Sequence, residues 1–287
     1  MLQVARLAST ELRDAAPAVA DYLRSALDTD GGARGRTDQG DLYYTVFALD
    51  GLVALRAQIP SERVARYLES FGGGEGLDFV HLACLARCWA AVGIERLDDD
   101  DRNGLLERIS RHRAADGGFG PRPRAERGTA YHAFLAWGAY QDLGAPPPSA
   151  AAMATSLVAL ETGDGGYANE PGMSVGTTPA TAAAVTLLRQ VGQAPAPSAG
   201  PWLLDRAHPH GGFRAAPGAP IPDLLSTATA LHALAGLQIS PVAVKEPCLD
   251  FVDTLWTGRG FCGSWADEEP DVEYTFYGLL ALGHLSL

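Results

Sequence analysis

Hydrophobic residues recur along the whole chain in pairs of helix-length segments. In each pair the first segment carries apolar residues on one side at helical spacing, and the second is apolar almost all round. In the first pair these segments are residues 11–27 and 43–55. A helix with one polar side lies at the surface, whereas a helix that is apolar all round is buried. The pattern therefore predicts helical hairpins, each with one outer and one inner helix.

A glycine-rich turn separates the two helices of each pair, and it occurs six times. Its clearest copy is Asp116-Gly117-Gly118-Phe119, and the first glycines of successive copies are 41, 45, 48, 46 and 49 residues apart. A fixed period of this length is the signature of a repeat protein. The chain is therefore expected to form one domain over residues 1–287, built from six repeats. The inner helices are predicted to begin near residues 43, 78, 129, 178, 223 and 271.

The last repeat is as apolar as the middle ones. Its segment Tyr274-Thr275-Phe276 echoes Tyr44-Thr45-Val46 of the first repeat. An open array of repeats needs polar caps at both ends, so two apolar terminal repeats are expected to pack on each other. The predicted fold is all-α, an (α/α)6 toroid of six helical hairpins with inner and outer helix rings.

Composition and charge narrow the function. The 34 acidic and 22 basic residues give a net charge of −12, which argues against nucleic-acid binding because phosphates require a basic surface. No apolar run approaches the roughly 20 residues of a transmembrane helix, and the first 22 residues lack the apolar core of a secretion signal. Four cysteines do not form a disulfide framework. We expect a cytoplasmic protein without a transmembrane segment.

The repeat resembles a known family. A Gly-Gly-aromatic turn followed by an inner helix that opens Asp41-Leu42-Tyr43-Tyr44-Thr45, and again Asp271-Val272-Glu273-Tyr274-Thr275, is similar to the protein prenyltransferase β-subunits and the terpenoid cyclases. The resemblance implies an isoprenoid substrate held in an aromatic-lined central cavity. For the prenyltransferase branch it also implies a helical protein partner beside the toroid.

The resemblance also implies sites that this chain does not match. The prenyltransferases hold zinc with Asp-x-Cys and a later His, where this chain has Asp223, Leu225 and Tyr274. Leucine offers no metal ligand, so no zinc cofactor is expected. Magnesium stays open if the substrate carries a diphosphate. The cyclases use an acidic Asp-x-Asp-Asp motif, but Asp98-Asp99-Asp100-Asp101 opens an outer helix and is interpreted as a helix cap.

Candidate catalytic residues lie where the inner helices begin. The expected first positions are Asp41, Asp78, Thr129, Thr178, Asp223 and Asp271, and three residues later stand Tyr44, His81, His132, Thr181, Ser226 and Tyr274. Capping explains the first row, whereas the second row is predicted to surround a common cavity. Carboxylates that converge on such a cavity can include a general acid with a raised pKa. The predicted catalytic residues are Asp271, Glu273, Asp41, His132 and Asp223.

Predicted substrate contacts are aromatic and basic. The first group comprises Tyr44, His81, Tyr131, Trp137, Tyr274 and Tyr277, for each of which core packing is the alternative role. Arg34, Arg36 and Arg122 lie in loops near the inner-helix N-termini, where they either bind a diphosphate or remain solvated. His81 and Cys88 are about 10 Å apart along their helix, too far to share one metal ion.

Two classes of function remain open. The first is an isoprenoid- or lipid-handling enzyme without the family's zinc site, acting by acid catalysis or by electrostatic assistance. The second is a non-catalytic isoprenoid carrier, or a helical scaffold that retains only the fold. Carboxylates around the predicted cavity favour the enzyme. The missing zinc ligands favour the alternatives, as does the lack of the Arg-x-x-Lys diphosphate motif that the resemblance implies before the fifth inner helix, where this chain has residues 215–219.

Overall fold

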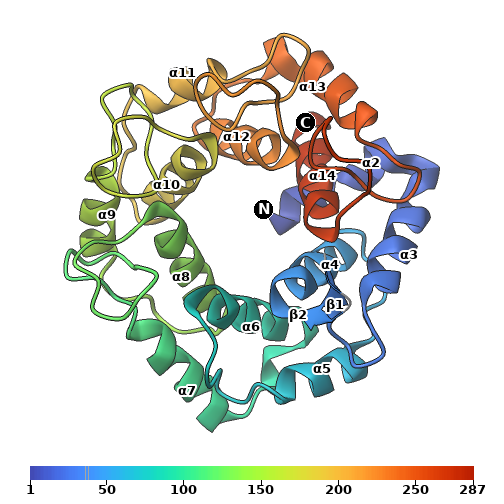
Figure 1. Ribbon diagram of the computed structural model, residues 1–287, viewed down its shortest axis with the longest axis vertical. Coiled ribbons are helices and arrows are strands. Elements are labelled where there is room, and N and C mark those ends of the chain that lie inside the picture. Colours follow the sequence, from blue (N-terminus) through green and yellow to red (C-terminus); the bar gives the residue numbers. More distant parts are fainter. Residues whose placement is uncertain (36, 38) are drawn as a thin grey trace.

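The computed structural model describes residues 1–35, 37 and 39–287 and shows two concentric rings of helices (Figure 1). The inner ring consists of α4 (Leu42–Ala54), α6 (Phe79–Val92), α8 (Ala130–Asp142), α10 (Thr178–Gln190), α12 (Leu224–Gly236) and α14 (Val272–Leu285). The outer ring consists of α3 (Ala16–Ala26), α5 (Ser61–Glu69), α7 (Asp99–Ser110), α9 (Ala150–Val158), α11 (Ala199–Leu204) and α13 (Val242–Thr254). The predicted toroid of outer and inner helices is confirmed.

Short elements complete the described part of the chain. α1 (Leu2–Ala5), α2 (Ala8–Leu12) and the 3-10 helix η1 (Arg13–Ala15) precede α3, so the helix predicted over residues 11–27 is interrupted. Pro17 in the first turn of α3 gives the reason, because proline is accepted there and not in a helix interior. A second 3-10 helix, η2 (Ile94–Arg96), joins α6 to α7, and β1 (Ala33–Arg34) pairs antiparallel with β2 (Gly40–Asp41).

The ring closes between the first and last repeats. α14 packs against α4, its neighbour across the closure, in the same way that successive inner helices pack on one another. In the outer layer, the Tyr22 hydroxyl of α3 donates to the Pro270 carbonyl at 2.9 Å. A side chain at Gly260 would lie 2.8 Å from the Tyr22 ring, so the glycine allows this close approach. The predicted contact between the first and last hairpins is thus confirmed.

The glycine turn packs closely against the outer helix of the following repeat. At the third turn the Asp116 carboxylate accepts hydrogen bonds from the amides of Gly118, at 3.0 Å, and Gly128, at 3.1 Å. Gly117 has a φ of +91°, a conformation that favours glycine, and an added Cβ there would lie 2.5 Å from Ala152 of α9 in the following repeat. The motif therefore sets both the local turn and the contact between repeats.

The threonine of the inner-helix motif ties the turn to the helix. The Thr227 hydroxyl donates to the Asp223 carbonyl at 2.7 Å and accepts from the Phe213 amide at 2.9 Å, so the buried amide is satisfied. Four repeats make the accepting bond, through Thr45, Thr181, Thr227 and Thr275. This bond explains why the motif requires threonine.

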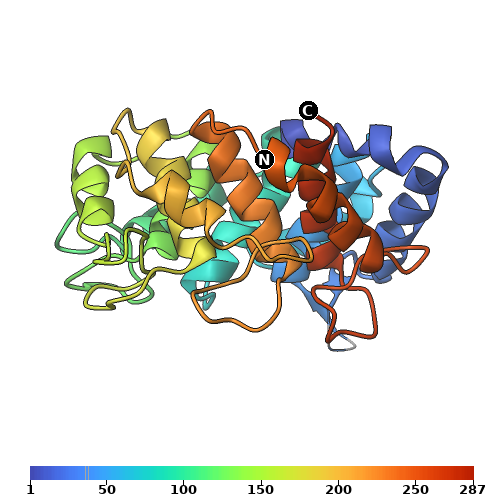
Figure 2. The same cartoon turned by 90° about the horizontal axis from the view of Figure 1, so that it is seen from above.

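The two faces of the ring differ. Figure 2 shows the loops that join outer to inner helices gathered on one face, with the C-terminus at the other. We call the end where the inner helices begin the mouth and the end where they finish the far end. α1 packs on α14 and α4, and Gly283 near the end of α14 leaves room for the Val4 backbone, so α1 lies at the far end. Among the described residues, no helix is both long and apolar enough to cross a membrane.

Candidate functional site

The inner helices begin with capping side chains, as predicted for the first row. The side chains of Asp41, Asp78, Thr129, Asp223 and Asp271 each accept a hydrogen bond from a backbone amide in the first turn, at 2.6 to 3.1 Å. The fourth helix differs from the prediction, because its N-cap is Thr177 and not Thr178. The residue three positions after that cap is Ala180. Thr181 is instead the fully buried threonine that bonds the turn.

The residues three positions after the caps differ in their surroundings. Ser226 is fully buried, and the rings of Tyr44 and Tyr274 pack against the loop glycines Gly35 and Gly263 of their own repeats. A common cavity surrounded by this row stays a prediction. Substrate contact by Tyr44 and Tyr274 stays a prediction.

The side chains that meet in the centre stand one position earlier. The Tyr43 hydroxyl of α4 donates to the Glu273 carboxylate of α14 at 2.7 Å. Tyr131 of α8 is 38% exposed, and the Glu273 charge contributes to the raised pKa of its hydroxyl, after burial and Cys84. α8 and α14 are separated in the ring by α6 and α4, so the Glu273 charge acts on Tyr131 from a helix that is not its neighbour in the ring.

Aromatic rings surround this pair. The rings of Tyr43 and Phe47 meet edge to face at 5.1 Å, and Phe47 lies 5.6 Å from Tyr277, one turn beyond Glu273. Burial, followed by the Glu273 charge, raises the pKa of both Tyr43 and Tyr277, so both hydroxyls stay protonated at neutral pH. In the sequence, these central side chains are the residues two and six positions after the N-caps of their inner helices. In contrast, Trp137 is a core residue that is 9% exposed.

A second ionisable cluster occupies the mouth. His81 places Nδ1 2.9 Å from Asp78 and Nε2 3.5 Å from Asp41. Burial acts to lower the pKa of His81, but the hydrogen bond and charge of Asp78, with the Asp41 charge, outweigh it and raise the value. The same contacts, working against burial, lower the pKa of Asp78. These contacts therefore favour the protonated form of His81, which lies between two carboxylates.

His132 and Asp223 lie in more enclosed surroundings. The His132 Nδ1 is 2.7 Å from the Thr129 hydroxyl, and its ring lies 5.3 Å from that of Phe79. Burial, and then the nearby His112, lower the pKa of His132. Burial raises the pKa of Asp223 despite the bond from the Ser226 amide. The catalytic roles assigned to these two residues stay predictions.

The loop arginines are spread over the mouth. The Arg34 guanidinium is 3.1 Å from the Asp28 carboxylate, an ion pair within its own loop. Arg122 is exposed on the loop before α8 and forms no ion pair with any residue the structure describes. Arg36 lies outside the described residues. Binding of a diphosphate by these arginines stays a prediction.

Three observations concern possible metal ligands. Asp98 caps α7 through the Asp100 amide at 2.8 Å, so the four-aspartate run is a helix cap, as interpreted. At the zinc position suggested by the resemblance, Asp223 is engaged in capping and Leu225 has no donor atom, so the residues do not fit zinc. Within the described residues, no group of three or more His, Cys, Asp or Glu side chains could hold a metal ion.

The far end carries a buried ion cluster that sequence reasoning missed. Arg87 of α6 lies 3.0 Å from Asp50 of α4 and 3.4 Å from Asp142 of α8. The Asp50 side chain is only 5% exposed. These residues join three neighbouring inner helices. The sequence does contain a signal for this cluster. Asp50 and Arg87 stand nine residues after the N-caps of their helices and Asp142 stands thirteen, which places all three on the helix face that carries Tyr43 and Glu273.

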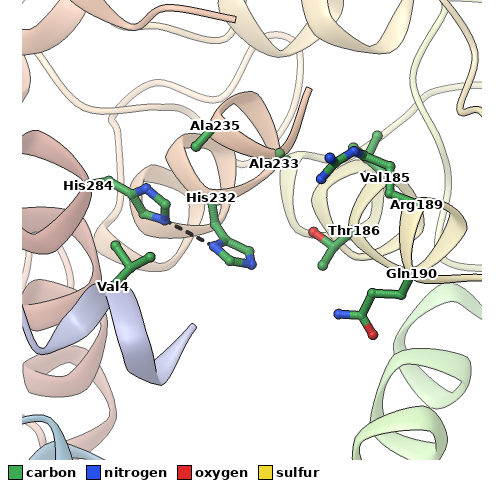
Figure 3. Close-up of a pocket in the computed structure, with 10 residues that line it drawn as sticks. Val4, Val185, Thr186, Arg189, Gln190, His232, Ala233, Ala235 and His284 are labelled. Carbon is green, nitrogen blue, oxygen red and sulfur yellow. Dashed lines mark hydrogen bonds between the residues drawn. The ribbon is translucent and has the colours of Figure 1, made fainter. Parts of the chain in front are cut away.

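A cavity of about 350 Å³ opens opposite that cluster, between the last turns of α10, α12 and α14. In it, His232 Nδ1 and His284 Nε2 form a 3.0 Å hydrogen bond (Figure 3). Burial is the largest cause that lowers the pKa of His232 to about 3 and of His284 to about 4, and the positive Met1 amino group adds to both. Both imidazoles are therefore neutral at neutral pH. The sequence analysis did not identify this cavity.

Comparisons with known proteins agree on the architecture. The family model described as the prenyltransferase alpha-alpha toroid domain matches residues 2–145, 92–198 and 181–286. A variant of the type II terpene cyclase MstE from Scytonema, in complex with geranylgeranyl dihydroxybenzoate, has a TM-score of 0.67 and 13% identity, over 98% of this chain and 97% of that one. Candida albicans protein geranylgeranyltransferase-I complexed with GGPP has a TM-score of 0.70 and 13% identity, over 94% and 90%. A protein from Actinoplanes has a TM-score of 0.61 and 15% identity, over 95% and 98%. The search of curated proteins gave no match.

Proposed function

This chain belongs to the prenyltransferase alpha-alpha toroid family, and on that premise we propose that it is an isoprenoid-handling enzyme whose chemistry takes place at Tyr43 and Glu273. The observation that carries the proposal is their 2.7 Å hydrogen bond at the centre of the ring, among the rings of Phe47, Tyr131 and Tyr277. A carboxyl group in an aromatic enclosure is suited to acid catalysis on an alkene.

The proposed step is an isomerisation. Glu273 in its protonated form transfers its proton to one carbon of an isoprenoid double bond, which leaves a carboxylate and a tertiary carbocation. An internal double bond attacks that cation, a carbon–carbon bond forms, and a proton is finally lost to a base. Aromatic faces stabilise cations, and Phe47 and Tyr277 supply them close to the acid.

Tyr43 and the mouth cluster supply the supporting roles. The Tyr43 hydroxyl positions the Glu273 carboxyl, and its raised pKa keeps it a donor. Asp41 and Asp271 cap the helices that carry these two residues, and the Asp41 carboxylate, which lies beside His81, is the proposed acceptor of the departing proton. No step uses zinc, because Leu225 offers it no ligand.

The test is to incubate the purified protein with farnesyl and geranylgeranyl diphosphate, with and without magnesium, and to analyse extracts and intact protein by mass spectrometry. We expect a cyclised product with the mass of the substrate, and Glu273→Gln should lower its formation by about 100-fold or more, in the range of general acid catalysis. Substrate that binds and stays unchanged would replace the enzyme with an isoprenoid carrier. Neither binding nor turnover would contradict the proposal as a whole.

A further inference from the structure

The far-end cavity presents hydrogen-bond donors and no acid. Figure 3 shows His232 on one side and Thr186, Arg189 and Gln190 of α10 on the other. After burial, the charged groups that lower the pKa of His232 are the Met1 amino group and Arg189, and both are basic. In a protein with a net charge of −12, a pocket without a neighbouring carboxylate is unusual.

Arg189 lines the cavity and packs against the neighbouring inner helix. An added Cβ at Gly236 of α12 would lie 2.6 Å from Nη1 of Arg189, so the guanidinium lies directly against the α12 backbone and would have to shift if this residue had a side chain. Arg189 forms no ion pair with any side chain in the described part of the chain.

The backbone carbonyls at the ends of these helices do not oppose an anion. In the turn after α10, backbone amides donate hydrogen bonds to the carbonyls of Leu187, Leu188 and Arg189. The turn after α12 does the same for the carbonyls of Ala233, Leu234 and Ala235. The carbonyl oxygens that normally make a helix C-terminus repel anions are thus already hydrogen-bonded.

We propose that this far-end cavity binds a small oxyanion of the phosphate or diphosphate class, held by Arg189 and His232. The Nδ1–Nε2 bond between the histidines lets His284 donate to His232, which leaves the His232 Nε2–H as a donor into the cavity. Arg189 supplies a fork of donors from the opposite wall, a geometry suited to phosphate oxygens. The site is separate from the Tyr43–Glu273 pair and does not depend on turnover there.

The test is isothermal titration calorimetry with inorganic pyrophosphate and, separately, with farnesyl diphosphate. We expect saturable binding of pyrophosphate to the unaltered protein, weakened about tenfold or more by Arg189→Gln, since a charged hydrogen bond is lost. Gly236→Ala should weaken it too, by displacing the guanidinium. The matched control is Arg66→Gln, an exposed arginine in the last turn of the outer helix α5, which should bind as the unaltered protein does.

Farnesyl diphosphate separates the two sources of the anion. If Arg189→Gln weakens both ligands, the cavity takes the headgroup of an isoprenoid; if it weakens only pyrophosphate, the cavity takes a free oxyanion. Glu273→Gln should retain pyrophosphate binding, so a failure of the proposed chemistry leaves this result intact. The inference is overturned if the protein does not bind pyrophosphate, or if Arg189→Gln binds it as tightly as Arg66→Gln. Matching thermal melts for the variants exclude loss of fold as the cause.

Discussion

The mouth and the far end of the ring carry opposite sets of ionisable side chains. Asp41, Asp78 and Glu273 gather at the mouth, where the inner helices begin, whereas Arg189, His232 and His284 gather where they end. Acids are favoured at helix N-termini and bases at C-termini, which agrees with this distribution of side chains. The proposed reaction and the proposed anion site lie at opposite ends of the ring.

Each end also holds a cluster in which one basic side chain lies between two carboxylates. The basic residue is His81 at the mouth and Arg87 at the far end. The difference is exposure, because the Asp50 side chain is 5% exposed whereas that of Asp78 is 66% exposed. The far-end cluster is therefore expected to matter for stability and the mouth cluster for chemistry.

The largest effect is expected from Arg87→Ala. It leaves Asp50 buried without its partner, and removal of one member of a buried ion pair costs about 3–5 kcal/mol. Urea unfolding measures the loss, with the exposed Arg66→Ala as the matched control. A cost below about 1 kcal/mol would show that water or a neighbour replaces the guanidinium, and the contrast in exposure would then have no consequence.

Acidification should affect the two ends in opposite directions. In the unfolded chain a histidine has a pKa near 6.5, but burial lowers the folded values to about 3 for His232 and about 4 for His284. As the pH falls from 6.5, only the unfolded chain takes up these protons, so stability is lost between pH 6.5 and the folded values. From pH 7 to 5 this amounts to about 2 kcal/mol for each histidine.

His81 has the opposite sign. Its folded pKa is raised by Asp78, so its contribution is present below pH 6.5 and is lost as the pH rises through the folded value. Imidazole NMR signals should show His81 titrating above 6.5 and the far-end pair well below it. Urea unfolding of a His232→Gln, His284→Gln double variant should lose most of the far-end pH dependence. A far-end pair that titrates near 6.5 would contradict the account.

Tyr43→Phe should separate function from stability at the mouth. It removes the bond to Glu273 and keeps the ring packing, so unfolding should cost about 1 kcal/mol, while product formation should fall about tenfold or more because the acid loses its positioning partner. Steady-state kinetics and urea unfolding measure the two effects. Equal kcat in the variant and the unaltered protein would remove Tyr43 from the site.

The smallest effect is expected from Asp100→Asn in the outer ring. This residue lies in the first turn of α7, where a carboxylate contributes about 0.3–1 kcal/mol through the helix dipole. Stability should fall by no more than that, and product formation should not change. A variant without activity would return the four-aspartate run to consideration as the acid.

The fold could be predicted from the sequence because similar motifs recur along the chain. Glycines such as Gly117 and threonines such as Thr227 act through backbone bonds that recur in most repeats, so their spacing is visible in the chain. The helix caps were predicted for the same reason. The Thr177 cap was misplaced by one residue because two threonines adjoin there and its side chain makes no capping bond.

The centre of the ring was harder to predict. The contacts of the Tyr44 and Tyr274 rings with the loop glycines Gly35 and Gly263 depend on loop geometry and not on helical period, so the sequence did not show them. Tyr43 with Glu273, Arg87 with Asp50 and His232 with His284 each join different repeats. Pairings of this kind follow from how the helices are rotated in the closed ring.

The most direct test of the central claim is to run the reaction in deuterium oxide. If Glu273 protonates an isoprenoid double bond, its exchangeable proton is a deuteron in that solvent. Mass spectrometry should then find one carbon-bound deuterium in each product molecule, and Glu273→Gln should lower product formation by about 100-fold or more. A product that forms at the normal rate without deuterium would contradict acid catalysis at this pair, because the carbocation would then arise by loss of the headgroup.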